Sequence, residues 1–410
     1  MRKPLTIVVF FFISFLHYHL FAQKTEFRVI GYVPNWIEVS AFANGFDFSR
    51  VTHINYAFQN PDANGNLIES NTGLTTLVNK AHENNVKVLV SLGGGSAAGG
   101  TTLTNYQNLI TTSEKRAAFI HKIALYLKQF SLDGIDVDEE GPAINSNYGP
   151  FIKQLTDSLR PKGYLITAAV GWGGGSIPNA TLRLFDFISL MSYDYTGYWD
   201  PSNPGQHSPY WYAQSMINEY IGRGVDKNSI ALGVPFYGYG FYNETGYQAY
   251  KDIISRFPNA YTIDKVSDTV YYNGTNTIRK KTTLALTKVA GIMIWELSLD
   301  MAGEKSLLKV INETIDSIGF NGIDDQEITS ELRLYPNPTS DYLDIEVVSV
   351  GNVYVSVEIV DIAGRVVINQ PIDLSYDRSV RMDVSVLENG LYICRCLTVD
   401  HAVSGIFIKK

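Results

Sequence analysis

The chain has 410 residues and a formal net charge of -8, and it is long enough for a barrel-sized core plus a smaller module. Hydrophobic residues make up 45% of the sequence and charged residues 18%, which excludes wholesale disorder. Nucleic acid is not an expected partner, because phosphate binding needs clustered Lys and Arg. A neutral polymer fits this composition better. Cys394 and Cys396 lie two residues apart in a strand-like segment, so we expect no disulfide between them.

The N-terminus is typical of a secretory signal peptide over residues 1–22. Two basic residues precede the apolar run Leu5–Leu16, and the small residue Ala22 precedes a polar stretch. An anchoring transmembrane helix is the alternative, but it needs about 20 unbroken apolar residues, and His17 and His19 interrupt this run. We therefore expect a secreted protein with no stable membrane insertion after processing.

Residues 25–319 alternate short β-rich runs with helical stretches, which is typical of repeated βα units around a parallel sheet. The candidate strands are Phe27–Val33, Val51–Phe58, Val86–Leu92, Gly134–Glu140, Tyr164–Val170, Phe187–Ser192, Ile230–Phe236 and Ala290–Trp295. Eight such units predict an α/β fold of the (β/α)8 TIM barrel type, with an open doubly wound sheet as the alternative. In such barrels the catalytic residues follow the carboxyl ends of the strands.

Aromatic residues gather at these strand ends. All five tryptophans are expected there and none in a helix, although core packing is the alternative for any one of them: Trp36, Trp172, Trp199, Trp211 and Trp295. Several tyrosines join them, namely Tyr32, Tyr195, Tyr198, Tyr237 and Tyr239. Together they indicate stacking platforms for the apolar faces of a ligand such as a sugar ring.

One strand carries a series of acids. Side chains alternate along a strand, so Asp136, Asp138 and Glu140 share the face that lines the barrel, while Ile135 and Val137 face the helix layer. Like charges disfavour mutual ionisation, so at least one of these carboxyl groups must hold a proton. A protonated carboxyl at the barrel rim can act as a general acid.

Two neighbouring features have simpler explanations. Asp133 has the opposite parity and is expected to be a hydrogen-bond anchor at the start of the strand. The acids also resemble the beginning of a calcium loop, but the twelfth position is Asn147 instead of Glu, and a β-rich run precedes the motif where a helix should. We therefore expect no metal site.

The spacing Asp133-x-x-Asp136-x-Asp138-x-Glu140 resembles the DxxDxDxE signature of family-18 glycoside hydrolases, the chitinases and related endo-β-N-acetylglucosaminidases. Further segments agree with this family in the correct order: Ser91–Gly94 with SxGG, Met191–Asp194 with MxYD, Gly233–Gly238 with the seventh strand, and Trp295 at the end of the eighth. The resemblance covers nearly all of residues 27–319.

The resemblance implies a retaining, substrate-assisted mechanism that proceeds through an oxazolinium ion. Glu140 would protonate the glycosidic oxygen, and Asp138 would bind the acetamide N–H of the sugar. Asp136 would share a proton with Asp138, and Tyr193 would hold the acetamide oxygen. The implied substrate-binding residues are Tyr32, Phe58, Met191, Asp194, Trp199 and Trp295. No cofactor is required, and the resemblance also implies a cis peptide at Ala57–Phe58, at Trp295–Glu296, or at both.

Two positions next to the acid depart from the family pattern. Glu139 stands where chitinases often carry a bulky apolar residue, and Gly141 where many have an aromatic. The segment between the seventh and eighth strands is also expected to be too short for the full α+β insertion of processive chitinases. That favours a shallower, endo-acting groove.

The C-terminal part has a different pattern. A polar, acidic linker is expected at 320–331, followed by a small all-β sandwich at 332–410. Asn389-Gly390 is placed as a hairpin turn between two β-rich runs. The Tyr335–Pro338 and Gly390–Tyr392 segments resemble the sorting domains that direct bacterial proteins through the type IX secretion machinery. A carbohydrate-binding sandwich is the alternative, but this module has no Trp. We expect the module to be removed after about Thr329.

The sequence leaves the substrate open between two polymers. Chitin or its N-acetylglucosamine oligosaccharides are favoured by the aromatic rim and by the Gly31–Trp36 segment. An endo-β-N-acetylglucosaminidase acting on N-glycans would use the same acid and the same acetamide chemistry. A catalytically inactive chitin-binding lectin on the same barrel typically lacks the acid, whereas Glu140 is present.

Overall fold

The structure is a computed structural model that describes residues 27–68, 70, 72–320, 331–348, 356–361, 365–371, 379–397 and 402–410. The predicted signal peptide at 1–22 and almost all of the predicted linker lie outside the described residues. The chain divides into two compact units between residues 320 and 321, and each unit is described by itself.

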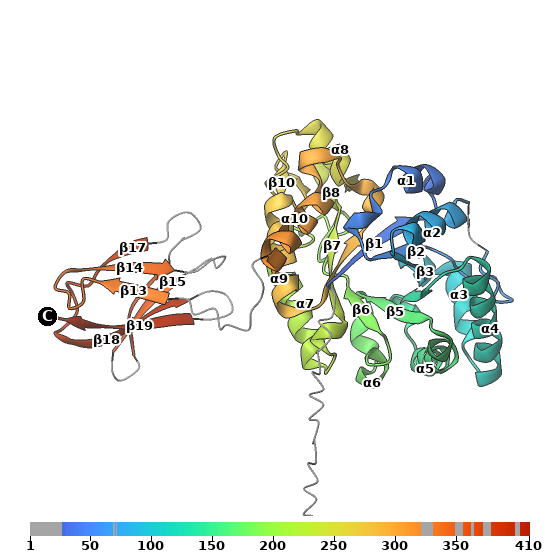
Figure 1. The fold of residues 1–410 in the computed structure, drawn as a ribbon, viewed down its shortest axis with the longest axis horizontal. Helices are drawn as coiled ribbons and strands as arrows, with labels where there is room; N and C mark the ends of the chain where they lie inside the picture. The colour runs from blue at the N-terminus through green and yellow to red at the C-terminus, as the bar shows by residue number, and fades with distance from the viewer. Residues whose placement is uncertain are drawn as a thin grey trace, which may run out of the picture. The chain divides into compact units, whose positions relative to one another are not determined.

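The first unit is a closed barrel of parallel strands in the order β1-β12-β7-β6-β5-β4-β3-β2, which confirms the predicted (β/α)8 fold (Figure 1). The strands are β1 Arg28–Pro34, β2 His53–Ala57, β3 Lys87–Gly93, β4 Gly134–Asp138, β5 Leu165–Val170, β6 Phe187–Leu190, β7 Ile230–Pro235 and β12 Gly291–Trp295. Because β1 pairs with both β2 and β12, the open doubly wound alternative is wrong.

Helices cover the outside of the barrel (Figure 1). They are α1 Val39–Gly45, α2 Leu74–Glu83, α3 Gly100–Leu109, α4 Ser113–Gln129, α5 Tyr148–Leu159, α6 Asn179–Leu182, α7 Tyr210–Gly222, α9 Thr275–Lys288 and α10 Leu307–Phe320. In α2 the residues Leu74, Leu77, Val78 and Ala81 are buried, an apolar stripe at helical spacing. Within the described ranges, no helix has the length and apolarity needed to cross a bilayer.

Trp211 corrects one prediction, because it is the second residue of α7 instead of a loop residue. Pro209, at the N-cap position, has φ -71, and the helix begins directly after it. The first turn of α7 consists of aromatic residues and has no polar face, so the sequence pattern did not indicate a helix there.

Strand alternation places the acids inside the barrel as predicted. On β1, Ile30 and Tyr32 belong to the apolar cluster inside the barrel, whereas Val29 and Val33 pack in the core between strands and helices. On β4, Ile135 and Val137 likewise pack in the outer core. Asp136 and Asp138, with the opposite parity, are buried in the interior at 0% and 3% exposure.

An α+β insertion lies between β7 and β12. It contains β8 Tyr237–Gly240, β9 Gly246–Ala249, α8 Tyr250–Arg256, β10 Lys265–Val266 and β11 Val270–Tyr271, and its four-stranded sheet has the order β10-β11-β8-β9. The sequence pattern did not show that a sheet forms in this segment. Strands of two to four residues are too short to show a clear alternation.

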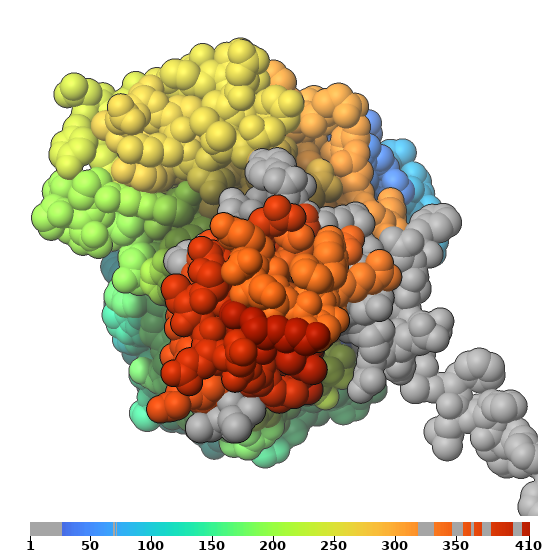
Figure 2. All heavy atoms as spheres, turned by 90° about the vertical axis from the view of Figure 1, so that its left-hand side faces the viewer, coloured from blue at the N-terminus to red at the C-terminus, as the bar shows by residue number. Residues whose placement is uncertain are grey.

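The second unit is a β-sandwich. One sheet contains β13 Glu331–Tyr335, β14 Tyr342–Val348 and β17 Ser379–Asp383; the other contains β15 Ser356–Val360, β16 Val366–Pro371, β18 Gly390–Leu397 and β19 Ala402–Lys409. Both sheets contribute to one core, which includes Ile345 of β14 and Cys394 of β18. The last two strands form a continuous red surface in Figure 2.

Two expectations about this unit have different outcomes. The prediction of a hairpin at Asn389-Gly390 is wrong, because the strands on either side of it, β17 and β18, belong to different sheets. The chain crosses between the sheets there. Cys394 and Cys396 are both free and buried, which confirms that they form no disulfide.

Asp133 joins β3 to β4 from the start of β4. Its Oδ2 accepts hydrogen bonds from the Val88 amide at 2.7 Å and from His82 Nε2 at 2.8 Å. Its own amide donates to the Val88 carbonyl at 2.8 Å. This is the anchoring position that strand parity predicts.

We expect Asp133→Ala to lower the free energy of unfolding of the barrel by about 1–3 kcal/mol, because the Val88 amide loses its acceptor. Chemical denaturation followed by circular dichroism measures the change. Asp157→Ala serves as the control, since Asp157 forms an exposed pair with Lys153 in α5, and such pairs contribute little. Equal stability of the two variants would contradict the anchoring role.

Candidate active site

The acids of β4 form a ladder from the barrel interior to its rim. Asp136 is fully buried, Asp138 is nearly so, and Glu140 is half-buried. β4 ends at Asp138, and Glu140 is the extended residue that precedes a short turn at Gly141–Ala143. Glu140 therefore keeps the parity of the ladder although it lies beyond the strand.

Asp136 is the hydrogen-bond centre of the interior. Its carboxylate accepts from Tyr32 Oη at 2.6 Å, Ser91 Oγ at 2.8 Å and Thr167 Oγ1 at 2.6 Å. Ser91 and Thr167 are its register partners on β3 and β5. Burial raises the pKa of Asp136, and the three hydroxyl bonds act against that rise. Three donors stabilise the charged form, so this is the favoured position for a negative charge in the ladder.

Asp138 lacks such partners. Its Oδ1 is buried and has no hydrogen bond among the described residues. Burial raises the pKa of Asp138 well above its ordinary value, and the charges of Glu140, Asp136 and Glu139 raise it further. Asp138 is therefore the ladder position that favours a proton, and its free oxygen can accept a hydrogen bond from a ligand.

Glu140 combines access with a raised pKa. Burial raises the pKa of Glu140 to about 7, and the charge of Asp194 contributes to the rise. Its Oε1 lies beside Gly95, where an added Cβ would be 3.4 Å away. A half-buried carboxyl of this kind retains a proton near neutral pH and can deliver it to a ligand at the rim.

Tyr193 and Asp194 follow β6 and face the ladder. The Tyr193 hydroxyl lies 3.9 Å from Met293 Sδ, which is a weak acceptor. Asp194 has φ +60 and accepts from Tyr237 Oη at 2.5 Å. His207 Nδ1 lies 3.4 Å from the same carboxylate oxygen, and burial lowers the pKa of His207. The Tyr237 hydroxyl therefore donates to Asp194, and the buried His207 ring lies beside the same oxygen.

Aromatic rings form a continuous strip from β12 to β1. The Trp295 ring stacks on Phe58 at 5.6 Å and 22°, and it lies 5.2 Å from Tyr32 and 6.5 Å from Trp36. The peptides Ala57–Phe58 and Trp295–Glu296 are both cis, which confirms the prediction. This strip provides apolar faces next to the ladder.

A second aromatic group follows β6. Trp199 is 53% exposed and packs edge-to-face on Tyr239 at 5.0 Å, and Tyr239 in turn contacts Tyr237. Met191 packs against the interior cluster that contains Tyr32, Phe58 and Tyr193. The structure thus brings all ten predicted site residues to the interior and the carboxyl-end rim of one barrel.

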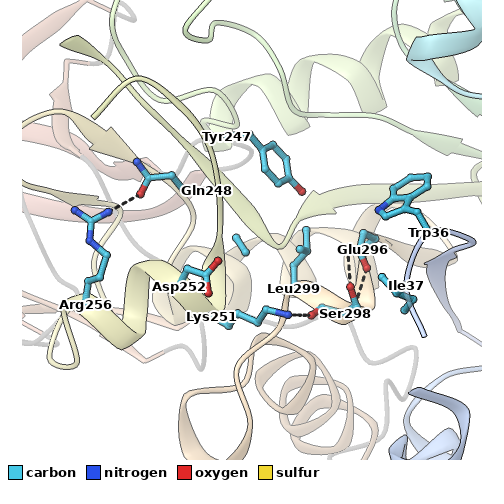
Figure 3. Close-up of a pocket in the computed structure, with 11 residues that line it drawn as sticks. Trp36, Ile37, Tyr247, Gln248, Lys251, Asp252, Arg256, Glu296, Ser298 and Leu299 are labelled. Atoms are coloured by element: carbon cyan, nitrogen blue, oxygen red, sulfur yellow. Dashed lines mark hydrogen bonds between the residues drawn. The ribbon is translucent and has the colours of Figure 1, made fainter. Parts of the chain in front are cut away.

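A pocket of about 480 Å³ continues the strip beyond Trp36 (Figure 3). It is lined by Trp36, Ile37, Tyr247, Gln248, Ala249, Lys251, Asp252, Arg256, Glu296, Ser298 and Leu299. Figure 3 shows the Asp252 carboxylate and the Tyr247 hydroxyl pointing into this space. Lys251 Nζ donates to the Ser298 carbonyl at 2.7 Å, and Glu296 accepts from the Ser298 amide at 2.7 Å. Polar groups beside an aromatic face are the chemistry of a sugar-binding groove.

Sequence reasoning missed the hydroxyl partners of Asp136 and the donors to Asp194. Ser91 appeared only as part of a family motif and Tyr237 only as an aromatic ring of the rim, and Thr167 and His207 were not assigned roles at the site. A signal for Thr167 exists, because it belongs to the interior face of its strand. Using that signal requires the register between β4 and β5, which pairs Asp136 with Thr167.

Glu139 is a buried acid outside the ladder. It is 5% exposed and has the parity that faces the helix layer. Burial raises the pKa of Glu139 to about 8, and the charge of Glu140 adds to this. The charge of Glu139 contributes to raised pKa values of Tyr106 and Tyr148, which places it near these tyrosines.

A closed (β/α)8 barrel with an acid ladder that ends in a proton-holding Glu at the rim, between exposed aromatic faces, defines the class of glycoside hydrolases. Residues 28–300 match the family model for glycosyl hydrolases family 18, and the chain belongs to this family. Residues 333–410 match the model of a secretion system C-terminal sorting domain.

Solved structures agree with this assignment. The chain is 34% identical to the GH18 chitinase ChiB of Flavobacterium johnsoniae, with 71% of this chain and 94% of that chain covered and a TM-score of 0.66. It is 26% identical to a chitinase of Bacteroides thetaiotaomicron, with coverage of 73% and 99% and a TM-score of 0.63. A chitinase-like effector of Moniliophthora roreri is 30% identical over an alignment that covers 51% of this chain. The same alignment covers 58% of that relative's length.

We expect the stability of the Glu139→Gln variant to fall less than that of the parent protein when the pH is raised from about 5 to about 8. The folded chain holds the Glu139 proton up to a pKa of about 8, whereas the unfolded chain releases it near the ordinary value of 4.5. The folded state therefore binds more protons between these values, and stability falls as pH rises through this window.

Thermal unfolding at about pH 5 and about pH 8 measures this effect. The difference in Tm between the two pH values should be smaller in Glu139→Gln than in the parent protein. Glu83→Gln is the control, because Glu83 is an exposed residue of α2, and it should keep the parent difference. An unchanged difference in Glu139→Gln would refute the buried, protonated state of Glu139.

Proposed function

We propose that this protein is a secreted, endo-acting chitinase that hydrolyses β-1,4-linked N-acetylglucosamine polymers with retention of configuration. The observation that carries the proposal is the unpartnered, buried Oδ1 of Asp138 between a hydrogen-bonded Asp136 and a proton-holding Glu140. An acceptor in this place matches the N–H of a 2-acetamido group. The aromatic strip at Trp295 supplies the face on which the same sugar ring stacks.

The reaction begins with proton transfer from Glu140 to the glycosidic oxygen. The acetamide carbonyl oxygen of the sugar attacks C1 as the C1–O bond to the leaving sugar breaks, which yields an oxazolinium ion. Water then attacks C1 and gives its proton to the Glu140 carboxylate, and the acetamide is restored. A pKa of about 7 allows Glu140 to serve as acid and then as base near neutral pH.

The remaining ladder residues stabilise charge and geometry. Asp138 accepts the acetamide N–H and stabilises the positive charge that develops on the oxazolinium ring. Asp136, held by Tyr32, Ser91 and Thr167, carries the compensating negative charge and shares a proton with Asp138. The Tyr193 hydroxyl, whose acceptor among the described residues is the Met293 sulfur, donates to the acetamide oxygen.

The choice of chitin rests on the length of the aromatic surface. Exposed rings extend from Trp36 on the β1 side to Trp199 beyond β6, and such a row suits a linear chain of identical sugars. The relatives described as chitinases at 34% and 26% identity support the same substrate. The small insertion between β7 and β12 supports an open groove that cleaves within the chain.

We expect Glu140→Gln to lower kcat on chitin hexasaccharide by about 10²- to 10⁴-fold while oligosaccharide affinity stays similar, because Gln keeps the shape but delivers no proton. Asp138→Asn should also lower kcat, since it weakens stabilisation of charge that exists only along the reaction path. Product analysis by mass spectrometry measures both.

A high-mannose glycopeptide assayed in parallel separates the two substrates. Cleavage of the glycopeptide alone would replace chitin by N-glycans, and binding of chitin without cleavage by the parent protein would indicate a lectin. Near-normal turnover by Glu140→Gln would remove the acid assignment and the mechanism built on it.

Export is part of this proposal, and sequence features near both ends of the chain support it. We expect the signal peptide to be removed near Gln23, and the sorting domain matched at 333–410 to be recognised by the type IX machinery and cleaved after about Thr329. Intact-mass measurement of protein from the culture medium and the cell surface of the native host tests both cuts. A full-length species that remains in the cytoplasm would contradict this route.

A further inference from the structure

Trp172 is the exposed ring that lies against the residue following the rim acid. It comes two residues after β5 and is 64% exposed. Its carbonyl accepts a hydrogen bond from the Gly141 amide at 3.0 Å, and Gly141 is the direct neighbour of Glu140. The indole and the proposed general acid are therefore adjacent at the rim.

Two glycines make this approach possible. A Cβ on Gly141 would lie 2.5 to 2.8 Å from three ring atoms of Trp172, and a Cβ on Gly173 would lie 2.9 to 3.2 Å from the backbone of Gly141. Both have positive φ, +50 and +83, which other residues rarely adopt. Any side chain at position 141 would displace the indole, so the ring occupies the place that such a side chain would take.

The loop that carries Trp172 is braced from α7. Arg223 donates through Nη1 to the Gly174 carbonyl at 3.1 Å, and through Nη2 to the Ile177 carbonyl. The Gly174 amide donates to the Gly171 carbonyl at 2.9 Å. An exposed ring on a braced loop loses little conformational freedom when a ligand stacks on it, which is the property of a built binding surface.

The barrel order shows on which side of the acid this ring lies. In the ring of eight strands, β5 is directly across from β1 and β4 is directly across from β12. Trp36 and Trp295, which follow or end β1 and β12, therefore lie on the far side of the acid from Trp172. A sugar chain that stacks on Trp295 and passes Glu140 next reaches Trp172.

We propose that Trp172 binds the apolar face of the sugar on the leaving-group side of the cleaved bond. The inference rests on the proposed function, because Glu140 must be the acid for the two sides to be defined. The same surface holds an incoming sugar when a second saccharide, instead of water, attacks the oxazolinium ion. The ligand class is therefore a β-linked N-acetylglucosamine oligosaccharide used as leaving group or acceptor.

The oxazoline of chitobiose serves as a substrate that has no leaving sugar. It therefore tests binding of the acceptor sugar at this surface without the step in which a leaving group departs. The oxazoline nitrogen first takes a proton from solvent, which gives the oxazolinium ion. Water or the 4-hydroxyl of an acceptor sugar then attacks C1, the ring C1–O bond breaks to restore the acetamide, and the attacking hydroxyl gives its proton to Glu140, which releases it to solvent. The products are chitobiose or a longer oligosaccharide. The ratio of transfer to hydrolysis, with chitotriose as acceptor, reports binding on the acceptor side within each variant.

We expect Trp172→Ala to lower this ratio about tenfold, because the acceptor loses its stacking face. Trp172→Phe should recover most of the ratio. Leu125→Ala is the control, since Leu125 is an apolar residue that is 53% exposed on α4 in the outer helix layer, and it should keep the parent ratio. If Trp172→Ala showed the same ratio of transfer to hydrolysis as the parent protein, with oxazoline turnover intact, the inference would be overturned and the proposed function would stand.

A binding measurement does not depend on turnover. In the Glu140→Gln background, titration calorimetry with chitohexaose compares Trp172 with Trp172→Ala, and we expect about tenfold weaker binding for the latter. Equal affinity would overturn the inference even if the protein proved to bind chitin without cleaving it. Absence of oxazoline turnover in the parent protein, together with weaker binding in Trp172→Ala, would reject the mechanism but keep the surface.

Discussion

The site depends on how the barrel stabilises one buried negative charge. Asp136 has no contact with solvent, and isolated burial of a carboxylate is very unfavourable. Three hydroxyl groups from β1, β3 and β5 offset that cost, each through a bond of 2.6 to 2.8 Å. Because Asp136 takes the charge, Asp138 above it is left to the proton, and the raised pKa values continue outward to Glu140. The order of charges along β4 is therefore set at its deepest residue.

The rim of the barrel provides the aromatic surface for ligand binding beside these charged residues. The Trp295 ring contacts the rings of both Tyr32 and Phe58, and Trp36 and Trp199 extend the aromatic surface in two directions. The polar groups beside these rings are held by internal hydrogen bonds, as at Asp194. A site that is rigid before the ligand arrives loses less entropy on binding. Chemistry and recognition thus depend on the same set of strand ends.

The sequence was sufficient where a side-chain period determined the outcome. Alternation along β4 predicted which acids line the barrel, and it predicted the separate position of Asp133. The sequence was insufficient where two strands had to be aligned, as for Thr167 and Asp136, because register does not appear in a single segment. Prediction from the sequence also failed where the packing of neighbouring elements, and not the local residue pattern, determined the structure. Trp211 falls in α7, and Asn389-Gly390 connects two sheets instead of two paired strands.

The two cysteines of the C-terminal unit provide a chemical reporter for that unit alone. Both thiols are free and lie in its core on one face of β18. A thiol there can react with a labelling reagent only when the sandwich opens, so the labelling rate follows the opening equilibrium of the unit. The barrel contributes no thiol, because the chain has only these two cysteines. The stability of the tail can thus be measured in the intact chain, separately from that of the barrel.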